Sequence, residues 1–296
     1  MQQVLKEACR RAYVETGKLL GSPEGSVKFN VGAGGDISRK IDLVGEKTVI
    51  ETVKSYQMNP TIVGEECGII DGTDGFLIMD AVDGTTNAFR GIPYCCCSLA
   101  FATEPKLSCV TEAAVIDLTN GDLYSASKGN GSFLNDRKIE TKKKETLDLD
   151  DLVGGVNISA MPIEMLLHLA PFMMKIKHIR HFGANALELC HLSRGLLDLS
   201  VDFRMKIRPT DVAASFLIVT EAGGKILNPT GGPIDLSVFP KTTLSYIGLS
   251  DNAIFRYIEP DVKNFIKKWS ARAGIRTRVE GVTVPHTGPD YTAKDH

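Results

Sequence analysis

The sequence predicts an α/β protein with an α+β N-terminal part and an α/β C-terminal part. Three observations support this prediction: helical spacing of apolar residues up to Tyr56, short apolar runs between residues 61 and 134, and alternating strand and helix patterns from 154 to 222. We place a boundary at residue 150, because the pattern changes after the polar stretch that precedes it. The predicted divisions are 1–150, 151–275 and a polar C-terminal tail at 276–296.

The individual elements are assigned in chain order from these patterns. A helix is expected over 1–20 and a second one between Asp36 and Tyr56, because apolar residues recur there on one stripe. In the N-terminal part we expect strands at 61–63, 76–79, 95–102, 111–117, 122–126 and 131–134. In the C-terminal part we expect strands at 154–157, 177–182 and 197–202, and helices at 162–174, 185–193 and 211–222.

Composition excludes several classes of protein. With 43% hydrophobic and 24% charged residues, the 296-residue chain has the composition of a soluble globular protein. A net charge of −2 gives no electrostatic basis for binding nucleic acid. The first residues lack the pattern of a signal peptide, and no apolar run approaches the roughly 20 residues of a membrane-spanning helix. We therefore expect a cytoplasmic protein without nucleic-acid or membrane partners.

The seven cysteines include three in a row, Cys95, Cys96 and Cys97. Neighbouring residues of an extended segment point to opposite faces, so these three cannot form one metal site. We interpret them as small buried residues of a strand in a reducing compartment.

The strongest indication of chemistry is a pair of acids that follows a buried strand. The apolar run 76–79 leads into Asp80, and Asp83 comes three residues later. Two carboxylates so close raise each other's pKa unless a cation neutralises them, and oxygen ligands without His or Cys favour Mg²⁺. The following residues, Gly84, Thr85 and Thr86, offer N–H groups to a phosphate. Alone, the segment is also compatible with a simple Asp-Gly-Thr turn.

Two further acids occur in comparable settings. Glu65 follows the apolar run 61–63, and Asp211 begins a strongly apolar helix for which Thr210 is the expected N-cap. In isolation Glu65 also fits an exposed loop, and Asp211 also fits a purely structural role at a helix N-terminus. Their combination with Asp80 and Asp83 makes a shared divalent-cation site the better hypothesis.

Together these segments resemble the inositol monophosphatase family of lithium-sensitive, Mg²⁺-dependent phosphatases. Residues 80–87 (DAVDGTTN) resemble its first signature, and residues 210–215 (TDVAAS) resemble its second. The acidic element at 64–66, the helix start containing Asp42 and the substrate loop at 183–187 occur in the expected order. The sequence departs from the family pattern at Ala81, Thr210 and Ser215, where the family usually has Pro, Trp and Gly; none of these changes removes a ligand.

The resemblance implies a layered αβαβα sandwich of the sugar-phosphatase type and a two-part metal site. Glu65, Asp80 and the Val82 carbonyl would hold one ion, and Asp80, Asp83 and Asp211 would hold a second. The implied catalytic residues are Asp42, Glu65 and Thr85, with Asp42 and Thr85 orienting the attacking water. The implied cofactor is Mg²⁺, as two ions or three, with Mn²⁺ as a substitute. Two such ions clamp the attacking and leaving oxygens of an in-line displacement.

The resemblance also implies how a substrate is bound. The proposed contacts are the segment Gly84, Thr85 and Thr86, the loop Gly183, Ala184 and Asn185, and the side chains Arg180, Arg204 and Arg208. Arg204 occupies the position of a Glu that binds inositol hydroxyls in animal members. An arginine there favours a second phosphate, as in the archaeal-type members that hydrolyse fructose 1,6-bisphosphate and inositol 1-phosphate. The alternative for Arg204 is a surface salt bridge.

Hydrolysis of small phosphorylated sugars or polyols is therefore the expected function. The alternatives are a strict inositol monophosphatase, a 3′-phosphoadenosine 5′-phosphate phosphatase and a non-catalytic, metal-dependent binding protein. Family members are commonly dimers, so the resemblance also implies a homodimer.

Overall fold

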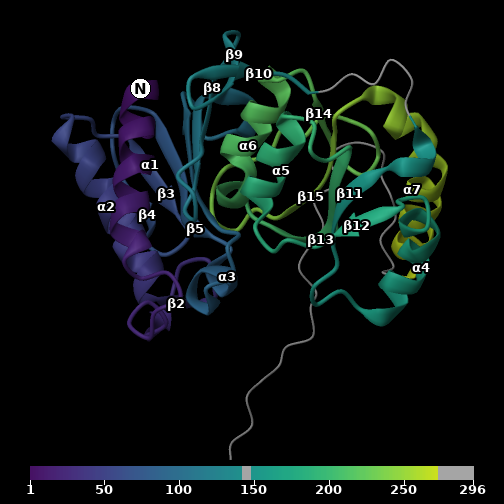
Figure 1. The fold of residues 1–296 in the computed structure, drawn as a ribbon, viewed down its shortest axis with the longest axis horizontal. Coiled ribbons are helices and arrows are strands. Elements are labelled where there is room, and N and C mark those ends of the chain that lie inside the picture. The colour runs from purple at the N-terminus through teal and green to yellow at the C-terminus, as the bar shows by residue number, and fades with distance from the viewer. Residues whose placement is uncertain (142–147, 273–296) are drawn as a thin grey trace, which may run out of the picture.

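The fold consists of five alternating layers of helices and sheets (Figure 1). It is known from a computed structural model that describes residues 1–141 and 148–272; the tail predicted at 276–296 lies outside these residues. The expected α/β class and layered αβαβα arrangement are therefore confirmed. The division at residue 150 stays a prediction.

An eight-stranded sheet forms the second layer, and α1 (Gln2–Gly17) and α2 (Lys40–Ser55) cover its outer face (Figure 1). All its neighbouring strands are antiparallel except β3 and β5, which run parallel. In spatial order its strands are β10 (Arg137–Ile139), β9 (Gly131–Leu134), β8 (Leu123–Ser127), β7 (Val110–Asp117), β6 (Cys96–Ala102), β5 (Phe76–Asp83), β3 (Thr61–Gly64) and β4 (Gly68–Ile70).

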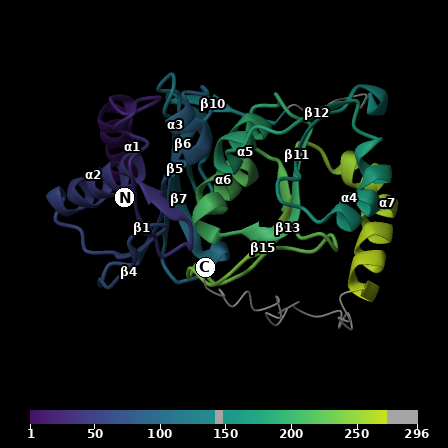
Figure 2. The same ribbon diagram turned by 90° about the horizontal axis from the view of Figure 1, so that it is seen from below.

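A five-stranded sheet forms the fourth layer, and α4 (Ile163–Met173) and α7 (Asn252–Arg272) cover its outer face (Figure 2). Its first two pairings, in the order given below, are parallel, and its last two are antiparallel. In spatial order its strands are β12 (His178–Arg180), β11 (Val153–Asn157), β13 (Leu199–Ile207), β15 (Leu244–Leu249) and β14 (Lys225–Leu227).

The middle layer consists of α5 (Asn185–Ser193) and α6 (Pro209–Glu221), which lie between the two sheets (Figures 1 and 2). Buried side chains of these helices, such as Leu189 and Ile218, share one hydrophobic cluster with Val115 and Tyr124 of the eight-stranded sheet. Burial of this apolar surface stabilises the contact and brings the start of α6 next to strands that precede it by more than a hundred residues.

The three adjacent cysteines are all fully buried, as predicted. Cys95 and Cys97 belong to one hydrophobic cluster, whereas Cys96 belongs to another, because successive side chains leave opposite faces of an extended chain. All seven cysteines are free thiols.

Several element boundaries differ from the expected ones. The second helix begins at Lys40, because residues 37–39 instead form β2 (Ile37–Arg39), which pairs with β1 (Lys28–Val31). The expected strand at 197–202 continues as β13 to Ile207, with a register shift where it pairs with β15. Among the described helices, none is long and apolar enough to span a lipid bilayer.

Candidate metal centre

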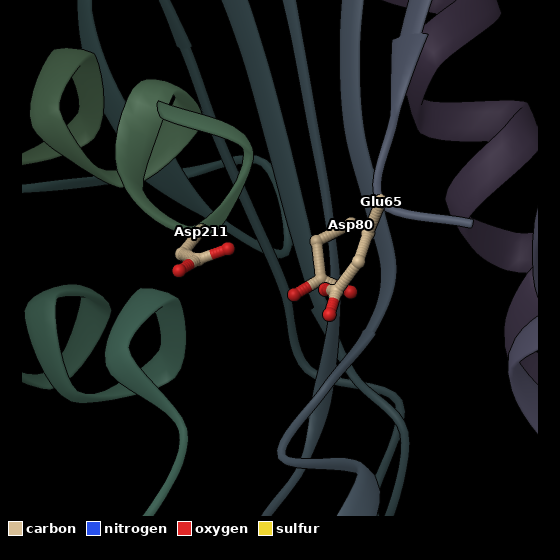
Figure 3. A group of neighbouring side chains, drawn as sticks. All are labelled: Glu65, Asp80 and Asp211. Carbon is tan, nitrogen blue, oxygen red and sulfur yellow. The ribbon is translucent and has the colours of Figure 1, made fainter. Parts of the chain in front are cut away.

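Two acidic side chains meet at one edge of the eight-stranded sheet because β3 and β5 run parallel there. The register places Gly64 of β3 opposite Met79 of β5. The next residues along the two strands are Glu65 and Asp80, so the pairing places their side chains next to each other (Figure 3). Parallel strands present their carboxyl ends at the same edge, which is where α/β proteins bind ligands.

The third acid, Asp211, reaches this edge from the first turn of α6 (Figure 3). Its carboxylate also caps the helix, since Oδ2 accepts a hydrogen bond from the Arg208 amide at 3.0 Å. Oxygen atoms of Glu65, Asp80 and Asp211 all lie within 4.8 Å of one another. The structure thus brings together three predicted metal ligands from two strands and a helix.

Crowding and burial make this cluster unfavourable for negative charge in the absence of a cation. Burial raises the pKa of Glu65 to about 8, and the charge of Asp211 contributes to the same rise. Burial also raises the pKa of Asp80, with smaller contributions from the charges of Glu65 and Asp83. Three carboxylates without His or Cys form a donor set that suits Mg²⁺ or Mn²⁺, and such an ion would neutralise the charges that repel.

A guanidinium group also lies within this cluster. Arg208 donates through Nη2 to Glu65 Oε1 at 2.6 Å, and its Nε lies 3.5 Å from Asp211 Oδ1. Its Nη1 donates to the Gly34 carbonyl at 3.1 Å, and a Cβ on Gly34 would lie only 2.1 Å from that nitrogen. Arg208 therefore contacts metal-ligand candidates directly, although the family resemblance implies a contact with the substrate.

The residues expected to orient water lie in the same place. One small cavity is lined by Asp42, Glu65, Asp80, Val82 and Thr85, among other residues. Asp42 Oδ2 accepts from the Arg39 amide at 2.9 Å, whereas the buried Oδ1 has no hydrogen-bond partner among the described residues. Burial raises the pKa of Asp42 to about 7, and the hydrogen bond from the Arg39 amide opposes the rise.

The Val82 carbonyl and the Asp83 carboxylate both have protein partners. The carbonyl accepts from the Thr85 hydroxyl at 3.1 Å. Asp83 Oδ2 accepts from the Ala186 amide at 2.7 Å, and burial raises its pKa to about 7, with the charge of Asp211 as the next cause. Asp83 is not part of the three-residue cluster, so its role as a ligand stays a prediction.

Comparison with known proteins identifies the origin of this arrangement. The family model described as "Inositol monophosphatase family" matches residues 1–252. The fructose-1,6-bisphosphatase/inositol-1-monophosphatase of Methanothermobacter thermautotrophicus is 34% identical over 244 residues, which cover 78% of this chain and 85% of that protein. The chain belongs to the inositol monophosphatase family. The predicted resemblance is confirmed, and so is the expectation of a phosphatase.

Two further members of the family support this assignment. Human inositol monophosphatase 1 is 31% identical over 211 residues, which cover 68% of this chain and 74% of that protein. A solved structure described as an inositol monophosphatase–fructose 1,6-bisphosphatase superposes with a TM-score of 0.76 at 27% identity, covering 88% of this chain and 98% of that one. Members of the inositol monophosphatase family depend on Mg²⁺, in agreement with the acidic cluster.

One detail of the expected helix start is wrong. We expected Thr210 as the N-cap of its helix, but α6 begins two residues earlier than expected, at Pro209, and Arg208 takes the capping position. Proline is favoured as a first helical residue because the amide that it lacks would have no partner there. The two helix-borne acids of this family member are placed alike, since Asp42 and Asp211 each accept from the amide three residues before them.

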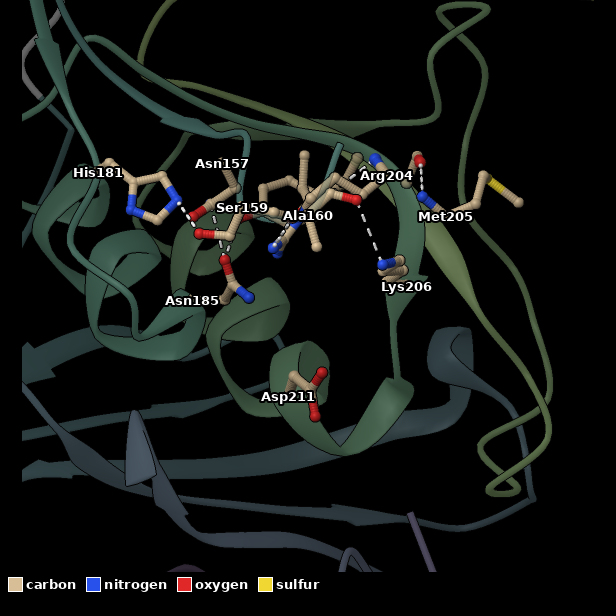
Figure 4. Close-up of polar contacts among 12 residues, drawn as sticks. Asn157, Ser159, Ala160, His181, Asn185, Arg204, Met205, Lys206 and Asp211 are labelled. Atoms are coloured by element: carbon tan, nitrogen blue, oxygen red, sulfur yellow. Dashed lines mark hydrogen bonds and ion pairs between the residues drawn. The ribbon is translucent and has the colours of Figure 1, made fainter. Parts of the chain in front are cut away.

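The substrate loop predicted from the family pattern packs directly against the Asp83–Gly84 turn. Gly84 has a φ of +87°, and a Cβ there would lie 3.0 Å from the Cβ of Ala184 and 3.2 Å from the Gly183 carbonyl oxygen. A larger residue at 84 would therefore push the loop away. Asn185 begins α5 and accepts from the Asn157 side chain at 2.8 Å (Figure 4).

The remaining predicted arginines, Arg180 and Arg204, lie on strands of the five-stranded sheet. Arg180 ends β12, is exposed, and donates to the neighbouring Ile179 carbonyl. Arg204 lies on β13 near Asp211 and donates through Nε to Asp202 Oδ2 at 2.9 Å (Figure 4). The Asp202 side chain is fully buried, so this ion pair is not the surface salt bridge considered as an alternative.

Two residues that connect parts of the site, Asn87 and Asp202, were not predicted from the sequence. Asn87 donates through its side-chain amide to the carbonyls of Tyr94 and Phe182, both at 2.8 Å. This contact ties helix α3 (Thr85–Arg90) to the segment before the predicted substrate loop. The signal that could have identified Asp202 is its spacing from Arg204. Residues two positions apart in a strand point to the same face, so the two side chains can meet.

Proposed function

We propose that this chain hydrolyses phosphate monoesters of small sugars and polyols, with fructose 1,6-bisphosphate (at the 1-phosphate) and inositol 1-phosphate as substrates. The observation that carries the proposal is the convergence of Glu65, Asp80 and Asp211 beside a cavity that also contains Asp42 and Thr85. The names of the relatives support the choice of substrates.

Glu65, Asp80 and the Val82 carbonyl are proposed to hold one Mg²⁺ ion, and Asp80, Asp83 and Asp211 a second. A third, weaker ion and substitution by Mn²⁺ belong to the same proposal. When bound, such ions neutralise the acidic cluster and increase the acidity of water. The carboxylates of Glu65, Asp80 and Asp211 fit this role because their oxygens converge, and Asp80 and Asp211 are also buried.

The chain itself positions the phosphate and the attacking water. Helix α3 (Thr85–Arg90) is preceded by Gly84, and the amides of Thr85 and Thr86 in its first turn have no acceptor within the helix. These amides, with the loop Gly183–Asn185 beside them, are proposed to bind the phosphoryl oxygens. Asp42 Oδ1 and the Thr85 hydroxyl are proposed to orient the attacking water.

Recognition of a second phosphate is proposed for Arg180 and Arg204. Arg204 uses its Nε and Nη2 on Asp202, while Nη1 donates to the Ser159 carbonyl at 3.3 Å (Figure 4). The charge of Asp202 partly offsets that of Arg204, so an exposed Arg180 is an expected second contact. Arg208 is proposed to act at the metal end of the substrate because of its contacts with Glu65 and Asp211.

A panel of substrates tests this function. We expect release of phosphate from fructose 1,6-bisphosphate and inositol 1-phosphate with Mg²⁺ and none with excess chelator. Turnover of 3′-phosphoadenosine 5′-phosphate tests the alternative that the chain is a nucleotide phosphatase. A turnover of inositol 1-phosphate that exceeds that of fructose 1,6-bisphosphate by orders of magnitude would support a strict inositol monophosphatase. If no substrate is hydrolysed, the alternative of a non-catalytic binding protein is supported. A homodimer in the cytoplasm is proposed from the family resemblance, and sedimentation equilibrium measures the dimer.

A further inference from the structure

Glu46 is a buried acid that lines the same cavity as Asp42, Glu65 and Asp80 and has no role in the proposed function. It lies on α2, and only 4% of its surface is exposed. No described lysine, arginine or histidine forms an ion pair with it. A buried carboxylate without a cation is costly, so its hydrogen-bond partners indicate what keeps it there.

Those partners are the backbone amides that follow the metal-ligand candidate Glu65. Glu46 Oε1 accepts from the Glu66 amide at 2.9 Å, and Oε2 accepts from the Cys67 amide at 2.8 Å. Both oxygens of one carboxylate therefore hold two successive peptide groups of the turn between β3 and β4. The carbonyls of the same turn are held from the other side, since those of Glu65 and Glu66 accept from the amides of Gly34 at 2.7 Å and Ala33 at 3.2 Å.

The residue before Glu65 is held just as closely. A Cβ on Gly64 would lie 2.6 Å from Glu46 Oε1, a separation that real Cβ atoms do not show. Position 64 therefore has to be glycine as long as Glu46 packs against it. The Glu46 carboxylate thus contacts the chain immediately before and immediately after Glu65.

We propose that Glu46 is a positioning residue that fixes the backbone of Glu65, so that the Glu65 carboxylate points at Asp80 and Asp211 and binds a divalent ion tightly. The inference rests on the proposed function only for the presence of that ion. Residues that orient a ligand typically change metal affinity by about 10–100-fold when they are substituted.

The experiment measures Mn²⁺ binding by the full chain without substrate, by electron paramagnetic resonance of the free ion. Glu46→Ala is expected to raise the Mn²⁺ Kd about tenfold or more. Glu46→Gln should raise it less, because its amide oxygen still accepts one of the two hydrogen bonds. It also provides a folded variant if the alanine protein does not fold. The control is Glu51→Gln, an exposed acid on the same helix whose change should leave the Kd unaltered.

A double-mutant cycle separates positioning from a general loss of charge. If Glu46 acts through Glu65, the substitution Glu46→Ala should have little further effect on the Kd in a Glu65→Gln background. An equal effect in both backgrounds, or an unchanged Kd in folded Glu46→Ala, would overturn the proposal. Failure of the unsubstituted chain to bind Mn²⁺ would instead contradict the proposed metal site itself.

Discussion

The Arg208 guanidinium donates to Glu65 Oε1 at 2.6 Å and so joins two residues that lie 143 positions apart in the chain. The Arg208 side chain is 17% exposed and that of Glu65 15%, so the pair is largely shielded from water. Asp211, the third member of the acidic cluster, lies 3.5 Å from the same guanidinium. A fixed positive charge thus lies among carboxylates that are also candidates for holding a metal ion.

Substituting this arginine should make the protein more dependent on metal. Arg208→Gln removes a cation from a buried acidic cluster, which should lower the free energy of unfolding without metal by about 2 kcal/mol. Added Mg²⁺ can neutralise the same carboxylates, so the rise in Tm on adding Mg²⁺ should be larger in the variant. Thermal unfolding with and without Mg²⁺ measures the rise in Tm, and the exposed Arg137→Gln is the control. Equal Mg²⁺-induced shifts in the two proteins would contradict the electrostatic role.

Removing one ligand charge should separate stability from activity. Asp211→Asn keeps an oxygen that can accept from the Arg208 amide, so α6 should remain capped. Less repulsion among the acids should leave the metal-free protein equally or more stable. Loss of the ligand should lower kcat by about 10³-fold or more.

Steady-state phosphate release and urea unfolding test both effects. Asp83→Asn is expected to behave in the same way, and the exposed Asp71→Asn should change neither quantity. A near-normal kcat in Asp211→Asn would refute its assignment as a metal ligand.

A buried acid outside the proposed set of metal ligands should make stability depend on pH. Glu188 of α5 is fully buried, and burial raises its pKa to about 8. The ordinary value is 4.5, so between pH 4.5 and 8 the folded chain binds this proton more tightly than the unfolded chain does. The contribution of this proton to the free energy of unfolding is present at low pH and is lost as the pH rises towards 8.

Glu188→Gln removes this titration. The loss of unfolding free energy between pH 5.5 and pH 8, measured by urea denaturation, should be smaller in this variant than in the unsubstituted chain. The exposed Glu164→Gln serves as the control and should retain the full loss. An identical pH dependence in Glu188→Gln would show that Glu188 does not bind a proton on folding.

A test of substrate recognition by Arg204 needs substitutions of both Arg204 and its ion-pair partner Asp202. Arg204→Gln alone leaves Asp202 buried without its cation, which should lower the free energy of unfolding by about 3 kcal/mol. The double variant Asp202→Asn/Arg204→Gln removes both charges and should recover most of that loss. Urea unfolding of the single and double variants measures the recovery.

The double variant then allows a comparison of substrates in a stable protein. If Arg204 contacts a second phosphate, the KM for fructose 1,6-bisphosphate should rise more than the KM for inositol 1-phosphate. Equal changes in the two KM values would argue against that contact.

The sequence alone was sufficient to locate the acids and the elements that carry them. Apolar runs that end on Glu65 and Asp80 predicted strands, and periodicity predicted the helix over 185–193 with the bounds that α5 has. These features are local, because strand and helix patterns depend on residues only a few positions apart. The match to a family signature identified the same acids.

Only the tertiary structure decided which partner each charged side chain has. Arg204 pairs with buried Asp202, Arg208 lies among the metal-ligand candidates, and Glu46 holds the turn after Glu65. A long arginine or glutamate side chain can reach several partners, and its choice depends on segments that packing brings together from distant parts of the chain. The parallel register of β3 and β5 and the packing of α6 against the eight-stranded sheet bring these partners within reach of one another.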